Sequence, residues 1–177
     1  DNLMIRIKSF MIGTLIGLNA LTQVQAFEKT IKVQWDDKGK FEQTILSKVA
    51  IGHWTYVELE YPEKYQKASD KMLINKNDKR AILNLSLNCI EPDEKSKFVI
   101  EDHRGLDRLN AEQRDLDILL DGQSYGNPFL QGAVELEKFK QAILSAKKIQ
   151  FNADAYGAPY HFLNQNADLL LTPVTCS

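Results

Sequence analysis

A short glycine-bounded motif gives the most specific chemical hypothesis in this sequence. The pattern G-x-S-x-G is formed by Gly122, Ser124 and Gly126, directly after an apolar stretch that predicts a strand. In serine hydrolases this pattern places the serine on a sharp turn between a strand and a helix, and an acid and a histidine follow along the chain. Asp154 and His161 occur in that order. A small serine hydrolase that uses Ser124 is therefore one hypothesis.

The residues around this motif favour a loop instead. It is followed closely by Asn127, Pro128 and Gly132, which interrupt a helix where the hydrolase fold needs one. The parallel sheet of that fold also needs crossover helices, and the sequence predicts only one main helix. Asp, Gly, Ser, Asn and Pro are common turn formers. We therefore interpret the segment as a connection between strands and expect no catalytic residue.

Metal coordination is the second chemistry to consider. The histidines His53, His103 and His161 are dispersed, and none has a second histidine at ligand spacing. A zinc site needs three or four convergent ligands. Glu101 and Asp102 precede His103 and are compatible with such a site, but exposed polar loop residues are the commoner interpretation. We expect neither a metal nor an organic cofactor.

A strand predicted over residues 54–61 combines groups that are typical of protein interfaces. Alternate residues of a strand share a face, so Trp54 and Tyr56 lie on the same side as Glu58 and Glu60. Aromatic rings contribute desolvated area and charges select the partner. The sequence therefore predicts a partner-binding surface with a partly exposed Trp54, and a partner with a basic surface. A solvated charged face and a Trp54 buried in the core are the alternatives.

A row of aspartates forms the second such face. Asp115, Asp117 and Asp121 align on one side of the next predicted strand, and apolar residues occupy the other side. We add these three carboxylates to the predicted partner-binding surface. A solvated face and calcium ligation are the other interpretations, although the segment contains no recognisable calcium-binding loop.

The two cysteines, Cys89 and Cys176, predict a disulfide. Two cysteines in an exported protein most often pair with each other. A metal site or a reactive thiol has less support, because there is no C-x-x-C spacing and no partner histidine. The bond would tie the middle of the chain to its penultimate residue. In the chain-entropy model, closing so long a loop contributes about 4–5 kcal/mol.

The first 26 residues predict export. A positive start, a short apolar core and a small-residue exit are formed by Arg6, Lys8, residues 10–21, Val24 and Ala26. This is the layout of a signal peptide, and its core is shorter than the roughly 20 apolar residues of a membrane span. We predict a signal peptide over residues 1–26, cleavage before Phe27, and one mature domain over residues 27–177 with no stable membrane anchor.

Charge limits the range of expected partners. Without Arg6, Lys8 and Asp1, the mature chain keeps 20 of the 22 basic and 23 of the 24 acidic residues, for a net charge of −3. Nucleic-acid binding usually needs a clustered basic face, and the sequence contains no run of basic residues. We therefore expect no nucleic-acid partner.

Alternation of apolar and polar residues predicts the elements that position these groups. Strands are predicted over residues 31–35, 54–61, 72–74, 81–90, 97–101, 115–120, 149–153 and 160–163. A helix is predicted over residues 136–147, where apolar residues recur at every third and fourth position. Residues 41–51 are compatible with a strand or a short helix. The predicted fold is α+β, a mostly antiparallel sandwich or open sheet with one main helix and one disulfide.

Three segments of the C-terminal half share the spacing of a known family. An apolar strand ends in cysteine at Leu83–Cys89, and a second strand ends in Asp-Gly at Leu116–Gly122. A helical run at Phe139–Ile149 is followed by the strand Tyr160–Leu163 and by the closing Cys176. This pattern resembles periplasmic accessory proteins of bacterial type VI secretion systems and covers about half of the chain.

These observations together predict a non-catalytic, exported domain that binds another protein. The resemblance implies a location in the periplasm of a Gram-negative bacterium and an accessory role in type VI secretion. Small exported proteins that neutralise secreted toxins have similar sequence features, so an immunity or inhibitor role is the other expectation within the same class.

Overall fold

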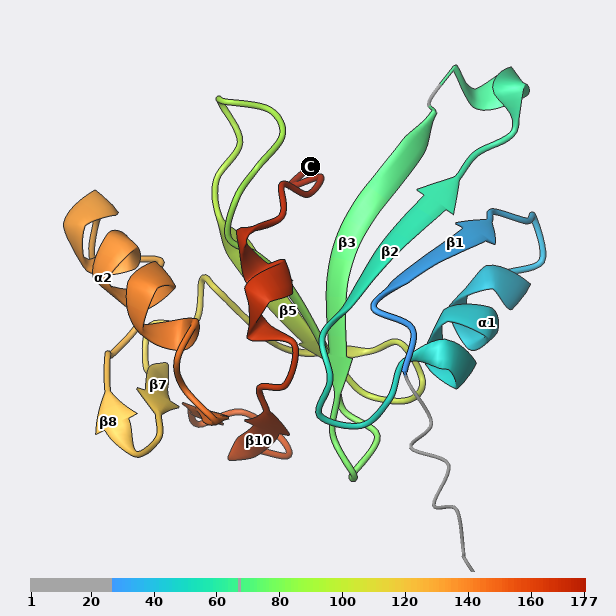
Figure 1. Cartoon of the computed structure of the whole chain (residues 1–177). Helices are drawn as coiled ribbons and strands as arrows, with labels where there is room; N and C mark the ends of the chain where they lie inside the picture. The colour runs from blue at the N-terminus through green and yellow to red at the C-terminus, as the bar shows by residue number, and fades with distance from the viewer. Residues whose placement is uncertain (1–26, 67) are drawn as a thin grey trace, which may run out of the picture.

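The computed structural model describes residues 27–66 and 68–177. The predicted signal peptide over residues 1–26 lies outside the described residues. The described part contains two β-sheets and two α-helices (Figure 1), so the predicted α+β class is confirmed. Among the described residues, no helix has the length and apolar character needed to cross a membrane.

The larger sheet has six strands in the same order as in the sequence. These are β1 (Thr30–Gln34), β2 (Thr55–Glu60), β3 (Ser69–Lys76), β4 (Ile82–Ser86), β5 (Lys97–Glu101) and β6 (Asp107–Asn110). From β2 onward each strand pairs with the next in antiparallel fashion. Residues 77–81 form the turn that connects β3 and β4.

The smaller sheet has four antiparallel strands. Their spatial order is β10 (Tyr160–Leu163), β9 (Lys148–Asn152), β7 (Asp117–Leu120) and β8 (Gln123–Ser124). The predicted helix is α2 (Ala133–Ile143), between β8 and β9, and it begins and ends earlier than predicted. Two short 3-10 helices, η1 (Glu63–Tyr65) and η2 (Ala167–Leu171), complete the elements of the described part.

The N-terminal part is a β–α–β unit, which the sequence left undecided. Residues 41–51 fall mostly in α1 (Lys40–Lys48), and α1 returns the chain so that β1 and β2 pair in parallel. The larger sheet is therefore mixed. α1 covers one face of it, through a small buried cluster of Ile31, Val33, Ile45, Val49, Val57, Leu59 and Ile74.

The other face of the larger sheet forms the main core. Figure 1 shows the smaller sheet and α2 on this side, opposite α1. The largest fully buried side chains in this layer are Trp54, Phe98, Phe139, Phe151 and Phe162. The fold therefore has a central six-stranded sheet with a helix on one face and a second sheet with its helix on the other.

Trp54 is completely buried, so the prediction of a partly exposed ring is wrong. The predicted alternation itself is present: Val57 and Leu59 pack on the α1 side, whereas Trp54 and Tyr56 contact the main core. The error lies in the assumption that one face of β2 meets solvent. The smaller sheet, built from residues far along the chain, covers that face at the N-terminal end of β2.

Asn164 connects the two layers through its side-chain amide. Its Oδ1 accepts a hydrogen bond from Trp54 Nε1 at 2.6 Å. Its Nδ2 donates to the backbone carbonyl oxygens of Ile143 and Ala146, at the C-terminal end of α2, at 2.7 and 2.8 Å. Because all of these groups are buried, each hydrogen bond avoids the cost of an unsatisfied polar atom.

Two asparagines of the β3–β4 hairpin bind the outer edge of β10. Asn75 Nδ2 donates to the carbonyl oxygen of Leu163 at 2.7 Å, and Asn77 Nδ2 donates to that of His161 at 3.1 Å. The carbonyl oxygens of an edge strand have no N–H donors from a neighbouring strand on their outer side, and these amide groups act as the donors instead. They also fix β10 against the β3–β4 turn.

The predicted disulfide between Cys89 and Cys176 is confirmed, with 5.4 Å between the Cα atoms. The tail beside it is also held by backbone hydrogen bonds. Val174 N donates to Asn88 O at 2.8 Å, and Thr175 N donates to Lys71 O at 2.9 Å. The C-terminal tail therefore lies between β3 and the segment that follows β4 (Figure 1).

Replacing both cysteines by alanine should lower the free energy of unfolding by about 2–5 kcal/mol, the usual cost of losing a native bridge. Urea denaturation of the mature protein measures this. Wild-type protein treated with a thiol reductant should unfold at the same urea concentration as the double variant. An unchanged midpoint after complete reduction would contradict a stabilising role of the bond.

Candidate functional site

A pocket of about 310 Å³ lies where three segments of the two layers meet. It is bounded by the β3–β4 turn, the β5–β6 turn and the loop before β10. We call it the Arg108 pocket. Its charged lining residues are Asp78, Lys79, Arg80, Asp102, Arg104 and Arg108.

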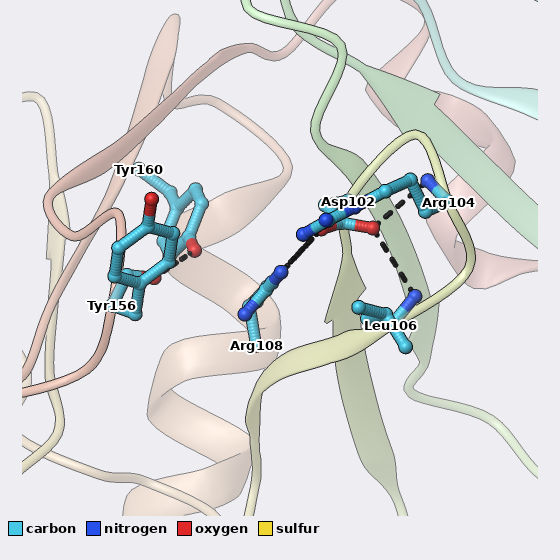
Figure 2. Close-up of polar contacts among 6 residues, drawn as sticks. All are labelled: Asp102, Arg104, Leu106, Arg108, Tyr156 and Tyr160. Atoms are coloured by element: carbon cyan, nitrogen blue, oxygen red, sulfur yellow. Dashed lines mark hydrogen bonds and ion pairs between the residues drawn. The ribbon is translucent and has the colours of Figure 1, made fainter.

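Asp102 organises this pocket. It directly follows β5, and its Oδ1 accepts hydrogen bonds from the backbone N–H groups of Arg104 and Leu106 at 2.8 and 3.2 Å, which closes the β5–β6 turn. Its Oδ2 accepts from Arg108 Nε and Nη2 at 3.1 and 2.5 Å, and from Arg104 Nε and Nη2 at 3.1 and 2.8 Å (Figure 2). These donors, Arg108 above all, hold the pKa of Asp102 well below its usual range.

Arg108 lies between Asp102 and two tyrosines, as Figure 2 shows. Its guanidinium carbon is 5.0 Å from the centre of the Tyr156 ring, a distance at which the ring face attracts a cation. Tyr160 donates its hydroxyl hydrogen bond to the backbone oxygen of Tyr156 at 2.5 Å. The Arg108 side chain is only 18% exposed, whereas Tyr156 is 80% exposed. A fixed arginine therefore lies behind an accessible aromatic ring.

The Arg108 pocket is basic, although the chain as a whole is acidic. Its lining contains four Lys or Arg residues and two aspartates, a net charge of +2 with neutral histidines, against −2 for the whole chain. Asp102 balances only one of the two arginines that bind it. The pocket can therefore accept an anionic group, and arginine guanidinium groups bind carboxylates with favourable geometry.

Three residues that line the Arg108 pocket, Asp102, His103 and His161, were named from the sequence, but only as metal-ligand or hydrolase candidates. Among the described residues, no group of three His, Cys, Asp or Glu side chains could hold a metal ion. The pairing of Asp102 with Arg108 was missed because β6 was not predicted. That strand is short and mostly polar, so it lacks the alternation that identifies a strand, yet it carries Arg108 back beside Asp102.

The G-x-S-x-G segment forms a β-hairpin. Leu120 pairs with Gln123, which leaves Asp121 and Gly122 as a two-residue turn with φ values of 49° and 86°. Positive φ at both positions is typical of a type I′ hairpin turn, and glycine favours it. Ser124 lies in β8, and its hydroxyl donates to Asp117 Oδ1 at 2.5 Å. This position differs from the strand-to-helix turn of a hydrolase nucleophile.

The three aspartates do not form the predicted row along one strand. Only Asp117 lies in β7, because Asp115 precedes the strand and Asp121 belongs to the turn after it. Each carboxylate accepts hydrogen bonds from its surroundings. Asp121 accepts from the backbone N–H groups of Lys147 and Lys148 at 3.0 and 2.9 Å, which fixes the start of β9.

Asp115 also forms hydrogen bonds within the domain. It accepts hydrogen bonds from Gln113 Nε2 and from the backbone N–H of Asp154. The hydrogen bond from Asp154 is the main cause that lowers the pKa of Asp115. Asp115 therefore ties the segment before β7 to the residues after β9.

Glu58 and Glu60 lie apart from the Arg108 pocket, near the C-terminal end of β2. Both approach Lys32 of the neighbouring strand β1, at 3.8 and 3.9 Å. Glu60 also accepts a hydrogen bond from Gln34. The negative charge of this pair is thus partly balanced within the sheet, and the aromatic residues predicted beside it contact the core.

Comparisons with protein-family models, with curated proteins and with solved structures gave no match for this chain.

Asp102→Asn should lower the melting temperature at pH 7. Because the folded-state pKa of Asp102 is lowered, its carboxylate contributes stability above pH 4, roughly where an unfolded aspartate titrates. That contribution is lost as the pH falls toward the folded-state value. The difference in melting temperature between the variant and the wild type should therefore become smaller as the pH falls from about 4 to about 2.

Thermal melts across this pH range measure this difference. Asp93→Asn, in an exposed loop, is the matched control and should show little difference from the wild type at any pH. A difference for Asp102→Asn that stays constant with pH would contradict a stabilising role for its charge.

Proposed function

We propose that this chain is an exported, non-catalytic domain of the bacterial periplasm that acts by binding another protein. The Arg108 pocket is the binding site for an acidic segment of that partner. The observation that carries this proposal is the pocket itself, which combines four cationic side chains with an exposed tyrosine on a chain of negative net charge.

The pocket suits a carboxylate for two physical reasons. Asp102 and the Tyr156 ring hold Arg108 in place before any ligand arrives, so less side-chain freedom is lost on binding. The exposed Tyr156 ring offers apolar area beside the charges, and arginine and tyrosine are among the residue types that most often dominate the energy of protein interfaces.

The acidic partner replaces the basic partner that the sequence predicted. Trp54 was the aromatic anchor of the partner-binding surface predicted from the sequence, and its burial makes it unable to contact a partner. Glu58 and Glu60 share Lys32 within the sheet. The Arg108 pocket keeps an excess of positive charge in its lining, so it favours an acidic partner segment.

Export has two sources of support. The residues over 1–26 have the layout of a signal peptide, and the disulfide between Cys89 and Cys176 is compatible with an oxidising compartment. An accessory role in type VI secretion and the neutralisation of a secreted toxin both belong to this function. An acidic segment on the partner is the feature that either role requires here.

Binding of fluorescein-labelled hexa-glutamate and hexa-lysine, followed by fluorescence polarisation at low salt, tests the proposal. The mature protein should prefer hexa-glutamate. Lys79→Gln combined with Arg104→Gln should weaken that binding by about tenfold, the sum of two exposed ion pairs. Both side chains are exposed, so the fold should be retained.

Lys95→Gln combined with Arg114→Gln is the control, because it removes the same charge at exposed positions outside the pocket. It should weaken binding far less. Equal losses of affinity for hexa-glutamate in both double variants would contradict the proposal, because only the net charge would then matter. A preference for hexa-lysine would also contradict it and would support the basic partner predicted from the sequence.

A further inference from the structure

A second pocket adjoins the Arg108 pocket. It has a volume of about 440 Å³ and lies between the β3–β4 turn, the β7–β8 turn and β10. We call it the Leu163 pocket. The two pockets share Asn77, Asp78 and His161 as lining residues. They therefore adjoin each other at the β3–β4 turn.

The Leu163 pocket exposes aliphatic side chains. Ile51 and Leu163 line it while remaining 52% and 44% exposed. Leu163 packs closely on the backbone of Gly52, because a Cβ atom at this position would lie 2.7 Å from Leu163 Cβ, and the φ of 76° favours glycine. The pocket thus has two exposed aliphatic side chains in its lining, and glycine permits the close approach of Leu163 to the chain.

The charges of the Leu163 pocket differ from those of the Arg108 pocket. It is lined by one lysine, Lys148, and by two aspartates, Asp78 and Asp121. With His161 neutral, its net charge is −1, so it has no preference for a second anion. An apolar side chain gains more there, because it removes the aliphatic surface of Ile51 and Leu163 from water.

The wall between the pockets is fixed. Asn77 is buried, and its Nδ2 donates to His161 O, so the shared residues are held by an inter-layer hydrogen bond. Asn77 Oδ1 also accepts from the backbone N–H groups of Lys79 and Ala81, at 3.1 and 2.8 Å, which fixes the turn itself. These hydrogen bonds therefore fix the distance between the two pockets.

We propose that the two pockets form one groove for an extended peptide segment. A carboxylate of the segment binds in the Arg108 pocket, and a large aliphatic side chain binds in the Leu163 pocket. This inference rests on the proposed function, since it assumes that the Arg108 pocket binds an acidic segment, and it names the second feature that the partner segment must carry.

Acetylated, amidated peptides with one glutamate and one leucine, separated by zero to four glycines, test the groove. They compete with labelled hexa-glutamate for the mature protein. At one spacing the peptide should compete about tenfold better than its counterpart with serine in place of leucine, the ratio expected for burying part of a leucine side chain.

Leu163→Ser should abolish this advantage of leucine and leave the affinity for hexa-glutamate unchanged. Leu130→Ser is the matched control, since Leu130 is 54% exposed and lines neither pocket, and it should keep the advantage. Ile51→Ser should act like Leu163→Ser.

The outcomes separate the two proposals. If hexa-glutamate binds but leucine gives no advantage at any spacing, or if the advantage survives Leu163→Ser and Ile51→Ser, the groove is wrong and the proposed function stands. If hexa-glutamate does not bind, both are overturned, because the groove depends on the Arg108 pocket.

Discussion

The hydrogen bond between the Trp54 indole and the Asn164 amide is the interaction on which the packing of this fold depends. Trp54 directly precedes β2 of the larger sheet, and Asn164 directly follows β10 of the smaller one. The same amide binds two carbonyl groups at the end of α2. One buried side chain therefore fixes three elements, and the cost of unsatisfied buried polar atoms disfavours other arrangements of the two layers.

The candidate site depends on this arrangement because both layers contribute to it. Arg108 belongs to β6 of the larger sheet, whereas Tyr156 and Tyr160 belong to the smaller sheet and the loop before it. A shift of one layer would separate the guanidinium group from the ring that it contacts. The hydrogen bonds of Asn75 and Asn77 to β10 also oppose such a shift, since they hold the β3–β4 turn beside both pockets.

Much of the fold could be predicted from local patterns. The strands over residues 97–101 and 160–163 were predicted with their observed bounds, because each is a short apolar segment bounded by polar or turn-forming residues. The sequence did not decide between a helix and a strand for the α1 segment, because its few apolar residues fit the spacing of either element. The sequence left the burial of Trp54 open, since alternation shows which residues share a face but not whether a distant part of the chain covers that face.

The site was less accessible to sequence reasoning. Counting charges along a strand identified Asp115 and Asp121, but their hydrogen bonds to backbone N–H groups appear only when the turns are in place. The Arg108 pocket draws residues from three separate turns, and no local spacing relates them. Its charge could be predicted only after the register of β5 and β6 was known.

A double-mutant cycle on Trp54→Phe and Asn164→Ala, measured by urea denaturation, tests the role of the inter-layer hydrogen bond most directly. Trp54→Phe keeps a buried ring and removes the Nε1 donor, and Asn164→Ala removes the acceptor. If the bond couples the layers, the two losses of stability should be non-additive, with an interaction energy of about 1 kcal/mol or more. Losses that add to within about 0.3 kcal/mol would contradict it.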